Sequence, residues 1–260
     1  AMTDGYEVCL CDIKQEFADG GRAKIQKNIN FLVGKEKISA EKGDEIMNKI
    51  VTCLKYICTD CDLVIEVCPE NMAIKKQTFT ELQQIVKKDC MFASNTSSLS
   101  ITEMGNGLDR PLIGMHFFNP ADRMKLVEVI AGANTPAELV EKIKGIAAEI
   151  GKTPVEVNEA AGFVVNRILI PMINEAVNVY AAGVASVADI DVAMQLGANH
   201  PMGPLALGDY IGLDIVLAIM EVIYAETGDS KYAPAPLLRK MVRAGKLGKK
   251  TGEGFYNYSK

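Results

Sequence analysis

Tryptophan is absent from the 260 residues, and aromatic residues make up only 6% of them. This scarcity disfavours the exposed aromatic platforms on which single-stranded nucleic acids stack. A basic excess is also lacking, because 28 Lys and Arg stand against 33 Asp and Glu, for a formal net charge of -5. A chain of this charge has no general attraction for phosphate backbones. We therefore expect no nucleic-acid partner.

Long hydrophobic runs are also missing. No run approaches the ~18 uninterrupted apolar residues that a membrane-spanning helix needs. The most apolar stretch, 162–173, is broken by Asn166, Arg167 and Pro171. The first five residues have neither the basic region nor the apolar core of a signal peptide. We expect a cytoplasmic protein without a membrane partner.

All seven cysteines lie in the first 90 residues: Cys9, Cys11, Cys53, Cys58, Cys61, Cys68 and Cys90. An odd number without an export signal predicts reduced thiols. Cys58 and Cys61 form a Cys-x-x-Cys, which without a second pair or a nearby histidine is weak evidence for zinc or redox chemistry. Buried or incidental thiols are the default interpretation.

Hydrophobic residues make up 48% and charged residues 23% of the chain, as in globular proteins. Up to Glu159, short β-rich runs alternate with helical patterns. The predicted strands are 6–12, 62–66, 91–93, 112–118, 126–130 and 153–157, and the predicted helices are 16–34, 39–50, 72–86 and 136–150, with Ser39 and Thr135 as N-caps. This rhythm predicts parallel βαβ units.

After Glu159 only helical patterns follow, at 163–180, 189–196, 213–227 and 236–244. We therefore predict an α/β, Rossmann-like doubly wound domain at 1–159 and an all-helical domain at 160–260. The run 213–223, with Ile215, Ile219 and Val222, is more apolar than one domain needs to cover. It predicts a homodimer that forms through the helical domain.

The first predicted strand ends in Asp12, at the position where doubly wound domains hold an adenosine ribose. Such a domain needs an earlier strand and a Gly-x-Gly-x-x-Gly turn for the pyrophosphate, and neither precedes Asp12 here. Because that first strand is central and buried, we expect the natural molecule to have additional N-terminal residues. Asp12 favours NAD by repelling a 2′-phosphate, although Lys14 keeps NADP open.

The two histidines differ in their surroundings. His116 lies at the end of an apolar strand before Asn119-Pro120, and Glu128 lies within the apolar run 126–130. A buried carboxylate needs a partner, and a carboxylate-held imidazole suits general acid/base catalysis. A purely structural pair is the alternative for these residues alone. His200 lies in a loop between predicted helices, and we interpret it as structural.

Polar side chains at three other places are candidate ligand contacts. The segment 94–98 follows a strand and either binds a ligand or caps the helix that begins near Ser100. Asn166 interrupts an apolar helix face, where it binds substrate or pairs with backbone. Lys246, Lys249 and Lys250 form a basic cluster that is either solvated or attracts phosphate.

Several segments occur in one order: 62–66 (DLVIE), 94–98 (SNTSS), 116–120 (HFFNP), 125–129 (KLVEV), 162–167 (GFVVNR) and 249–256 (KKTGEGFY). Together they resemble the 3-hydroxyacyl-CoA dehydrogenase family, most closely its bacterial 3-hydroxybutyryl-CoA members. The resemblance runs from Tyr6 to Tyr258 and departs from the family only in the missing glycine turn. It implies an NAD(P)-dependent oxidoreductase that interconverts 3-hydroxybutyryl-CoA and acetoacetyl-CoA.

The resemblance also implies roles for single residues. His116 matches the catalytic histidine, Glu128 the carboxylate that orients it, Ser97 a serine that touches substrate and cofactor, and Asn166 an asparagine that holds the substrate oxygen. The implied cofactor contacts are Asp12, Glu70, Lys75, Asn95, Ser97 and Lys250, and the implied coenzyme A contacts are Asn28 and Lys35. No metal is implied.

Two other functions are compatible with the sequence. Some lens crystallins resemble this family without being catalytic, and some relatives act on sugar acids. The presence of all four residues matched to catalysis favours an enzyme over a structural protein. Loss of acyl-CoA binding on replacement of Lys35, an implied coenzyme A contact, would count against a sugar-acid substrate.

Overall fold

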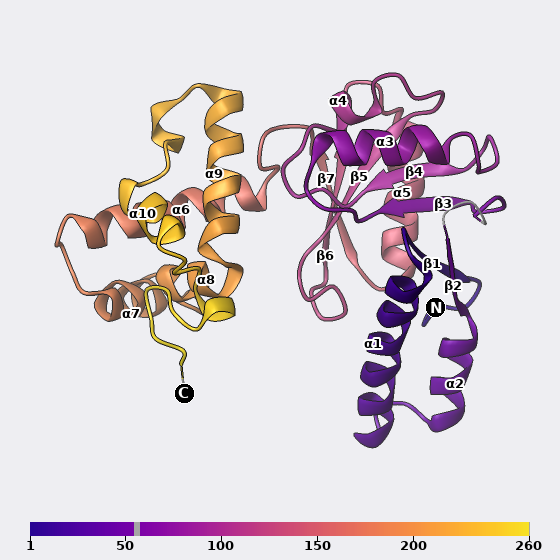
Figure 1. Ribbon diagram of the computed structural model, residues 1–260, viewed down its shortest axis with the longest axis horizontal. Helices are drawn as coiled ribbons and strands as arrows, with labels where there is room; N and C mark the ends of the chain where they lie inside the picture. Colours follow the sequence, from indigo (N-terminus) through magenta and orange to yellow (C-terminus); the bar gives the residue numbers. More distant parts are fainter. Residues whose placement is uncertain (55–57, 260) are drawn as a thin grey trace. The chain divides into compact units, whose positions relative to one another are not determined.

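The computed structural model describes residues 1–54 and 58–259 and contains two compact units. One comprises Ala1–Thr96 and Ile101–Glu156, and the other Ser97–Ser100 and Val157–Lys260. The first unit combines strands and helices, whereas the second is helical (Figure 1). The predicted fold class, a Rossmann-like α/β domain followed by a helical one, is confirmed.

The strands of the first unit form two separate sheets. Their bounds are β1 Val8–Asp12, β2 Ile50–Leu54, β3 Leu63–Glu66, β4 Met91–Ser94, β5 Leu112–Phe117, β6 Leu126–Ala131 and β7 Thr153–Asn158. β1 pairs with β2 in parallel, and the second sheet has the order β3-β4-β5-β6-β7. β3, β4 and β5 are parallel, but β6 runs antiparallel to β5, so the expectation of parallel units throughout is wrong there.

Among the described residues, no strand pairing joins β1 to β3. A doubly wound sheet of order 3-2-1-4-5-6 has its first strand between the strands that correspond to β1 and β3. The interruption therefore lies where the sequence lacks that strand. β2 was not predicted, because its residues were partly assigned to the preceding helix, which ends at Asn48.

The helices of the first unit cover the sheets. They are α1 Gln15–Gly34, α2 Ala40–Asn48, α3 Met72–Leu82, α4 Ile101–Gly105 and α5 Ala137–Glu149. The apolar core beneath α5 contains Ile113, Met115, Val127, Val129 and Ile143, each fully buried. Burial of such side chains, worth about 1.5–3 kcal/mol each, holds the strands that carry the candidate site in place.

Two predicted N-caps have different outcomes. Ser39 accepts a hydrogen bond from the Lys42 backbone N–H at 3.1 Å, as an N-cap should. Thr135 does not cap α5, whose N-cap is Pro136. Its hydroxyl instead donates to the Leu112 carbonyl at 2.6 Å and accepts from the Gly132 N–H at 3.0 Å. The second prediction is therefore wrong, because tertiary partners bind this hydroxyl.

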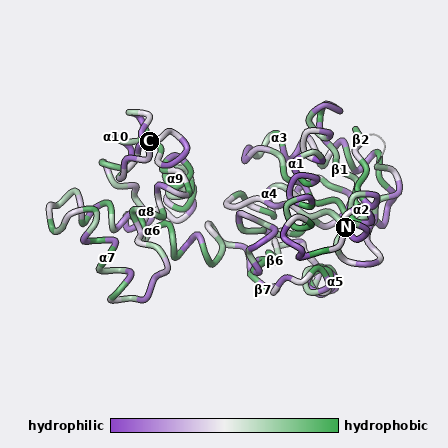
Figure 2. Tube along the Cα trace, turned by 90° about the horizontal axis from the view of Figure 1, so that it is seen from below, coloured by the Kyte–Doolittle hydropathy of each residue, from purple (hydrophilic) through white to green (hydrophobic). Residues whose placement is uncertain are grey.

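The second unit is a set of packed helices in which hydrophobic residues dominate α9 (Figure 2). Its elements are α6 Val165–Ala181, α7 Val187–Gly197, α8 Pro204–Ile211, α9 Leu213–Thr227, η2 Ser230–Tyr232, α10 Pro236–Arg243 and η3 Lys249–Thr251. α8 was not predicted. No described helix has the length and apolar character that crossing a membrane requires.

Two buried carboxylates organise the end of this unit. Asp191 on α7 accepts hydrogen bonds from the first-turn N–H groups of Leu205 and Ala206 on α8, at 2.8 and 2.9 Å. Asp209 on α8 accepts from the N–H groups of Phe255 and Tyr256, at 3.0 and 2.9 Å. Burial raises the pKa of Asp209 despite these donors. The two carboxylates therefore bind the C-terminal segment to α7 and α8.

Tyr256→Phe is expected to lower the free energy of unfolding by about 1.5–3 kcal/mol, the range for a hydrogen bond to a charged group. The Tyr256 hydroxyl donates to Asp191 at 2.7 Å, and Asp191 is only 4% exposed. Urea denaturation followed by circular dichroism measures the change. Tyr224→Phe, at a tyrosine that is 40% exposed, is the matched control. Equal stability of the two variants would contradict the prediction.

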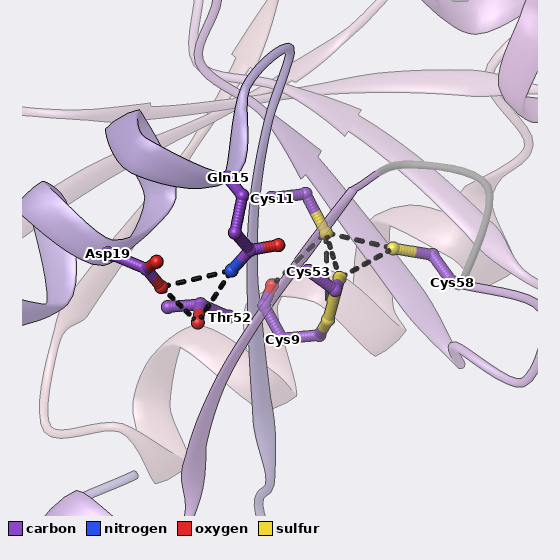
Figure 3. Close-up of a disulfide and its surroundings, with 7 residues drawn as sticks. All are labelled: Cys9, Cys11, Gln15, Asp19, Thr52, Cys53 and Cys58. Carbon is purple, nitrogen blue, oxygen red and sulfur yellow. Dashed lines mark hydrogen bonds between the residues drawn. A yellow bond between two sulfur atoms is a disulfide. The ribbon is translucent and has the colours of Figure 1, made fainter.

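A disulfide between Cys9 and Cys53 links β1 to β2 (Figure 3). The other five cysteines, Cys11, Cys58, Cys61, Cys68 and Cys90, have free thiols. The prediction that all seven thiols are reduced is therefore wrong for this structure. Parallel pairing places the two cysteines on adjacent strands, a proximity that their separation of 44 residues does not reveal.

Candidate active site

The carboxyl ends of β3, β4 and β5 meet at one edge of the larger sheet, since these strands are parallel. Asn95, the residue after β4, connects the three ends. Its backbone N–H donates to the Glu66 carbonyl at 2.8 Å, and its Oδ1 accepts from the Phe117 N–H at 2.8 Å. This edge is where ligands bind in open α/β sheets.

His116 and Glu128 lie directly opposite each other on β5 and β6. Directly opposed residues share a face of the sheet, and the antiparallel register brings Nδ1 of His116 to 2.8 Å from Oε2 of Glu128. The side chains are 5% and 1% exposed. A carboxylate can only accept, so the neutral ring carries its proton on Nδ1 and its lone pair on Nε2. A carboxylate-held imidazole of this kind can serve as a general acid or base.

A buried ion pair supports the same edge. Nζ of Lys75 on α3 lies 2.8 and 3.0 Å from the two carboxylate oxygens of Glu66, and it also donates to the Cys68 carbonyl at 3.0 Å. The Ser94 hydroxyl donates to Glu66 at 2.6 Å. The side chains of Lys75 and Glu66 are 1% and 0% exposed. Lys75, expected from the resemblance to contact the cofactor, is here bound to Glu66.

Glu70 belongs to this network as well. Its Oε1 accepts from the Thr96 hydroxyl at 2.6 Å, and its Oε2 lies 3.6 Å from Nζ of Lys75. The structure therefore brings together Glu70, Lys75 and Asn95 from the expected cofactor contacts. Sequence reasoning missed the central role of Glu66, although an acid that ends an otherwise apolar strand was a signal for a buried partner.

Asp12 and the expected coenzyme A contacts lie on other elements of the first unit. Asp12 ends β1 with an exposed side chain, and its Oδ1 accepts the Ile13 N–H at 2.7 Å. Asn28 lies on α1 and Lys35 directly follows α1 as its C-cap residue, and both are exposed. Nζ of Lys35 lies 5.9 Å from the centre of the Phe31 ring.

Ser97 and Asn166 come together in the second unit. Nδ2 of Asn166, in the first turn of α6, donates to the Ser97 carbonyl at 3.1 Å, and Asn166 is 8% exposed. The turn before α6 depends on Gly162, whose φ is +76° and whose Cβ would lie 2.8 Å from the Ile223 side chain. Glycine is therefore required at position 162, in the turn before the helix that carries Asn166.

Lys250 also lies in the second unit, where its Nζ is 2.7 Å from a carboxylate oxygen of Asp214. Its neighbours in the basic cluster are likewise engaged. Lys246 pairs with Glu253, and Nζ of Lys249 lies 5.5 Å from the centre of the Tyr210 ring. His200 follows α7, and its N–H donates to the Met194 carbonyl at 3.3 Å.

The described residues fit the adenosine ribose of NAD. Asp12 is an exposed carboxylate at the carboxyl end of a parallel strand, the arrangement that binds an adenosine 2′-hydroxyl. The neighbouring Lys14 is paired with Glu16 at 3.5 Å. No Gly-x-Gly-x-x-Gly motif occurs in the 260 residues, so the fit concerns the ribose and not the pyrophosphate.

A Rossmann-like sheet with an exposed acid where such domains hold an adenosine ribose, and with a buried His–Glu pair at the carboxyl edge of its parallel strands, is the arrangement expected of a nicotinamide-dependent dehydrogenase. Comparisons with known proteins identify the family of dehydrogenases. The family model "3-hydroxyacyl-CoA dehydrogenase, NAD binding domain" matches residues 1–160, and "3-hydroxyacyl-CoA dehydrogenase, C-terminal domain" matches residues 162–258. The chain belongs to the 3-hydroxyacyl-CoA dehydrogenase family, and it is an NAD-dependent enzyme of that family.

Individual relatives agree with this assignment. The chain is 53% identical to a 3-hydroxybutyryl-CoA dehydrogenase of Clostridioides difficile over 98% of its own length and 92% of that protein. It is 38% identical to the mitochondrial hydroxyacyl-coenzyme A dehydrogenase of Homo sapiens, covering 99% and 85%. The crystal structure of (S)-3-hydroxybutyryl-CoA dehydrogenase from Ralstonia eutropha matches with a TM-score of 0.95 at 44% identity, covering 98% and 92%.

Proposed function

We propose that this dehydrogenase interconverts 3-hydroxybutyryl-CoA and acetoacetyl-CoA, with His116 as the general acid and base. The observation that carries the proposal is the buried contact of 2.8 Å between His116 and Glu128 at the carboxyl edge of the parallel strands. The short acyl chain is supported by the names of relatives that are 44–53% identical over nearly the whole chain. A sugar-acid substrate has no such support.

Nε2 of His116 takes the proton of the 3-hydroxyl group during oxidation and returns it to the forming alkoxide during reduction. Bound NAD supplies the acceptor for the hydride that leaves the same carbon. Glu128 holds the ring in the tautomer that has its lone pair on Nε2, and its charge stabilises the imidazolium formed in oxidation. Both groups are buried, which strengthens their interaction relative to water.

The remaining assignments complete the proposal. Ser97 touches both substrate and cofactor, Asn166 helps to hold the oxygen of the substrate, and Asn28 and Lys35 contact its coenzyme A portion. Asp12 binds the ribose of NAD, while Glu70, Asn95 and Lys250 are further cofactor contacts. Lys75 acts as a positioning residue through Glu66, because its ammonium group is buried and bonded there.

We also propose a division of roles between the domains. Residues 1–159 supply most of the NAD contacts together with the coenzyme A contacts Asn28 and Lys35, and residues 160–260 supply further substrate contacts, carry Lys250 and form a homodimer. Exposed apolar side chains support the dimer: Leu196 is 83% and Ile168 69% exposed. Of the side chains expected at this interface, Ile215 is 44% exposed, but Ile219 is 7% exposed and belongs to the core of its own unit. A cytoplasmic location is the simplest setting for the five free thiols.

The direct test is loss of NADH absorbance on addition of acetoacetyl-CoA to the full chain. We expect a higher kcat/KM with acetoacetyl-CoA than with a 3-oxoacyl-CoA of much longer chain. We also expect a higher kcat/KM with NADH than with NADPH, since Asp12 repels a 2′-phosphate. A non-catalytic, crystallin-like protein would show no turnover, and equal rates with both chain lengths would overturn the short-chain assignment.

A further inference from the structure

Four cysteine sulfurs gather at the end of the smaller sheet, and we call them the thiol cluster: Cys9, Cys11, Cys53 and Cys58. Their Sγ atoms all lie within 4.8 Å of one another, and Figure 3 shows them converging from β1, from β2 and from the segment beyond β2. Cys9 and Cys11 share a face of β1 because strand side chains alternate, and Cys53 is the register partner of Cys11. Three sulfurs thus share one face of the sheet.

The spacing of these sulfurs is close to that around a single tetrahedral metal ion. Zinc–sulfur bonds of about 2.3 Å in a tetrahedron separate the sulfurs by roughly 3.8 Å. Sγ of Cys9 lies 3.6 Å from that of Cys11, and Sγ of Cys53 lies 3.7 Å from that of Cys58. Cys11 lies 2.9 Å from both Cys53 and Cys58, so each of these pairs needs to open by about 1 Å to fit this geometry.

We propose that the reduced thiol cluster binds one zinc ion through four cysteine thiolates. The Cys9–Cys53 disulfide must first be reduced: two molecules of a small thiol, R–SH, give two cysteine thiols and one R–S–S–R. Zinc then replaces four thiol protons, giving a site with four Zn–S bonds and a net charge of -2. Four protein ligands leave no open position, so the site is structural rather than catalytic.

Zinc binds cysteine as the thiolate, so the four cysteines of the cluster must lose their protons when the ion enters. Zinc binding accordingly releases protons and becomes tighter as the pH rises.

The position of the cluster connects it to the cofactor end of the domain. Cys11 immediately precedes Asp12, and the cluster lies on both strands of the smaller sheet. An ion bound there would hold together β1, β2 and the segment that begins at Cys58. We therefore expect zinc to raise the Tm of the full chain, since a ligand that binds only the folded state stabilises it.

The test is metal content after reconstitution of the full chain. The protein is reduced, freed of reductant and metal without oxygen, mixed with zinc and desalted. We expect about one zinc per chain, as a closed four-cysteine site holds. Cys11→Ser and Cys58→Ser should bind little zinc. Cys68→Ser is the matched control, because the Cys68 thiol contacts Thr78 outside the cluster. This variant should bind as much zinc as the parent protein.

Cobalt provides a second measurement that does not depend on stability or activity. Co²⁺ in the site should show thiolate-to-metal charge-transfer absorption, which Cys11→Ser and Cys58→Ser should reduce and Cys68→Ser should not. Circular dichroism confirms that each variant is folded. Equal zinc in all three variants indicates adventitious binding and overturns the proposal. No zinc in a chain with seven titratable thiols, or a disulfide that re-forms in the presence of zinc, also overturns it.

Discussion

His116→Gln is expected to lower kcat for acetoacetyl-CoA reduction by ~10²–10⁴-fold, the usual contribution of a positioned general acid or base. Glutamine fills much of the same space and can still hydrogen-bond Glu128, but it cannot exchange a proton near neutral pH. The Tm should change little, because the core around β5 is untouched. Steady-state NADH oxidation and a thermal melt measure the two quantities.

Two further variants make this result specific. His200→Gln removes the other histidine, which lies in the loop after α7, and should leave kcat unchanged. Glu128→Gln in the His116→Gln background should cost little more than His116→Gln alone, since Glu128 acts through the ring that it orients. A near-parental kcat for His116→Gln, or fully additive effects in the double variant, would contradict the proposed mechanism.

Glu66→Ala should destabilise the chain by about 3–5 kcal/mol, the cost of removing one partner from a buried ion pair. The Lys75 ammonium would keep the Cys68 carbonyl at 3.0 Å and the Glu70 carboxylate at 3.6 Å, but it would lose both oxygens of Glu66. A side chain that is 1% exposed has little water available to replace them. Urea denaturation gives the free energy of unfolding.

The matched control is an exposed pair of the same chemistry. Glu138 and Lys142 on α5 are 2.8 Å apart, and their side chains are 79% and 58% exposed. Glu138→Ala should cost less than about 1 kcal/mol. Combining Glu66→Leu with Lys75→Met should recover part of the loss, since it removes both buried charges. A cost for Glu66→Ala no larger than that of Glu138→Ala would show that the buried pair has no special role.

Much of the first unit could be predicted from local pattern. Apolar runs of strand length and helical spacing identified β3 to β7 and the long helices, because burial requires hydrophobic side chains wherever an element meets the core. β2 and α8 were missed. β2 directly follows a helix that ends at Asn48, and α8 has only eight residues between glycine-bearing turns, so neither shows a long periodic signal.

Residue type and order were sufficient to select His116, Glu128 and Asn166 as candidates. A lone histidine at a strand end and an acid in an apolar run require partners, and this follows from desolvation alone. Which groups are paired depends on strand direction. Because β6 runs antiparallel to β5, Glu128 lies opposite His116. Because α3 packs against the sheet, the Lys75 ammonium group binds the Glu66 carboxylate.

The amino-acid sequence by itself determined the class of fold and the family, and it selected His116 as the candidate acid/base residue, because these depend on hydrophobic spacing and on motifs within short segments. Only the tertiary structure decided that the larger sheet turns antiparallel at β6, that Lys75 is buried against Glu66, and that cysteines 44 residues apart meet on neighbouring strands. Those contacts join segments far apart in the chain. Sheet register and packing fix them, and neither can be inferred from one segment alone.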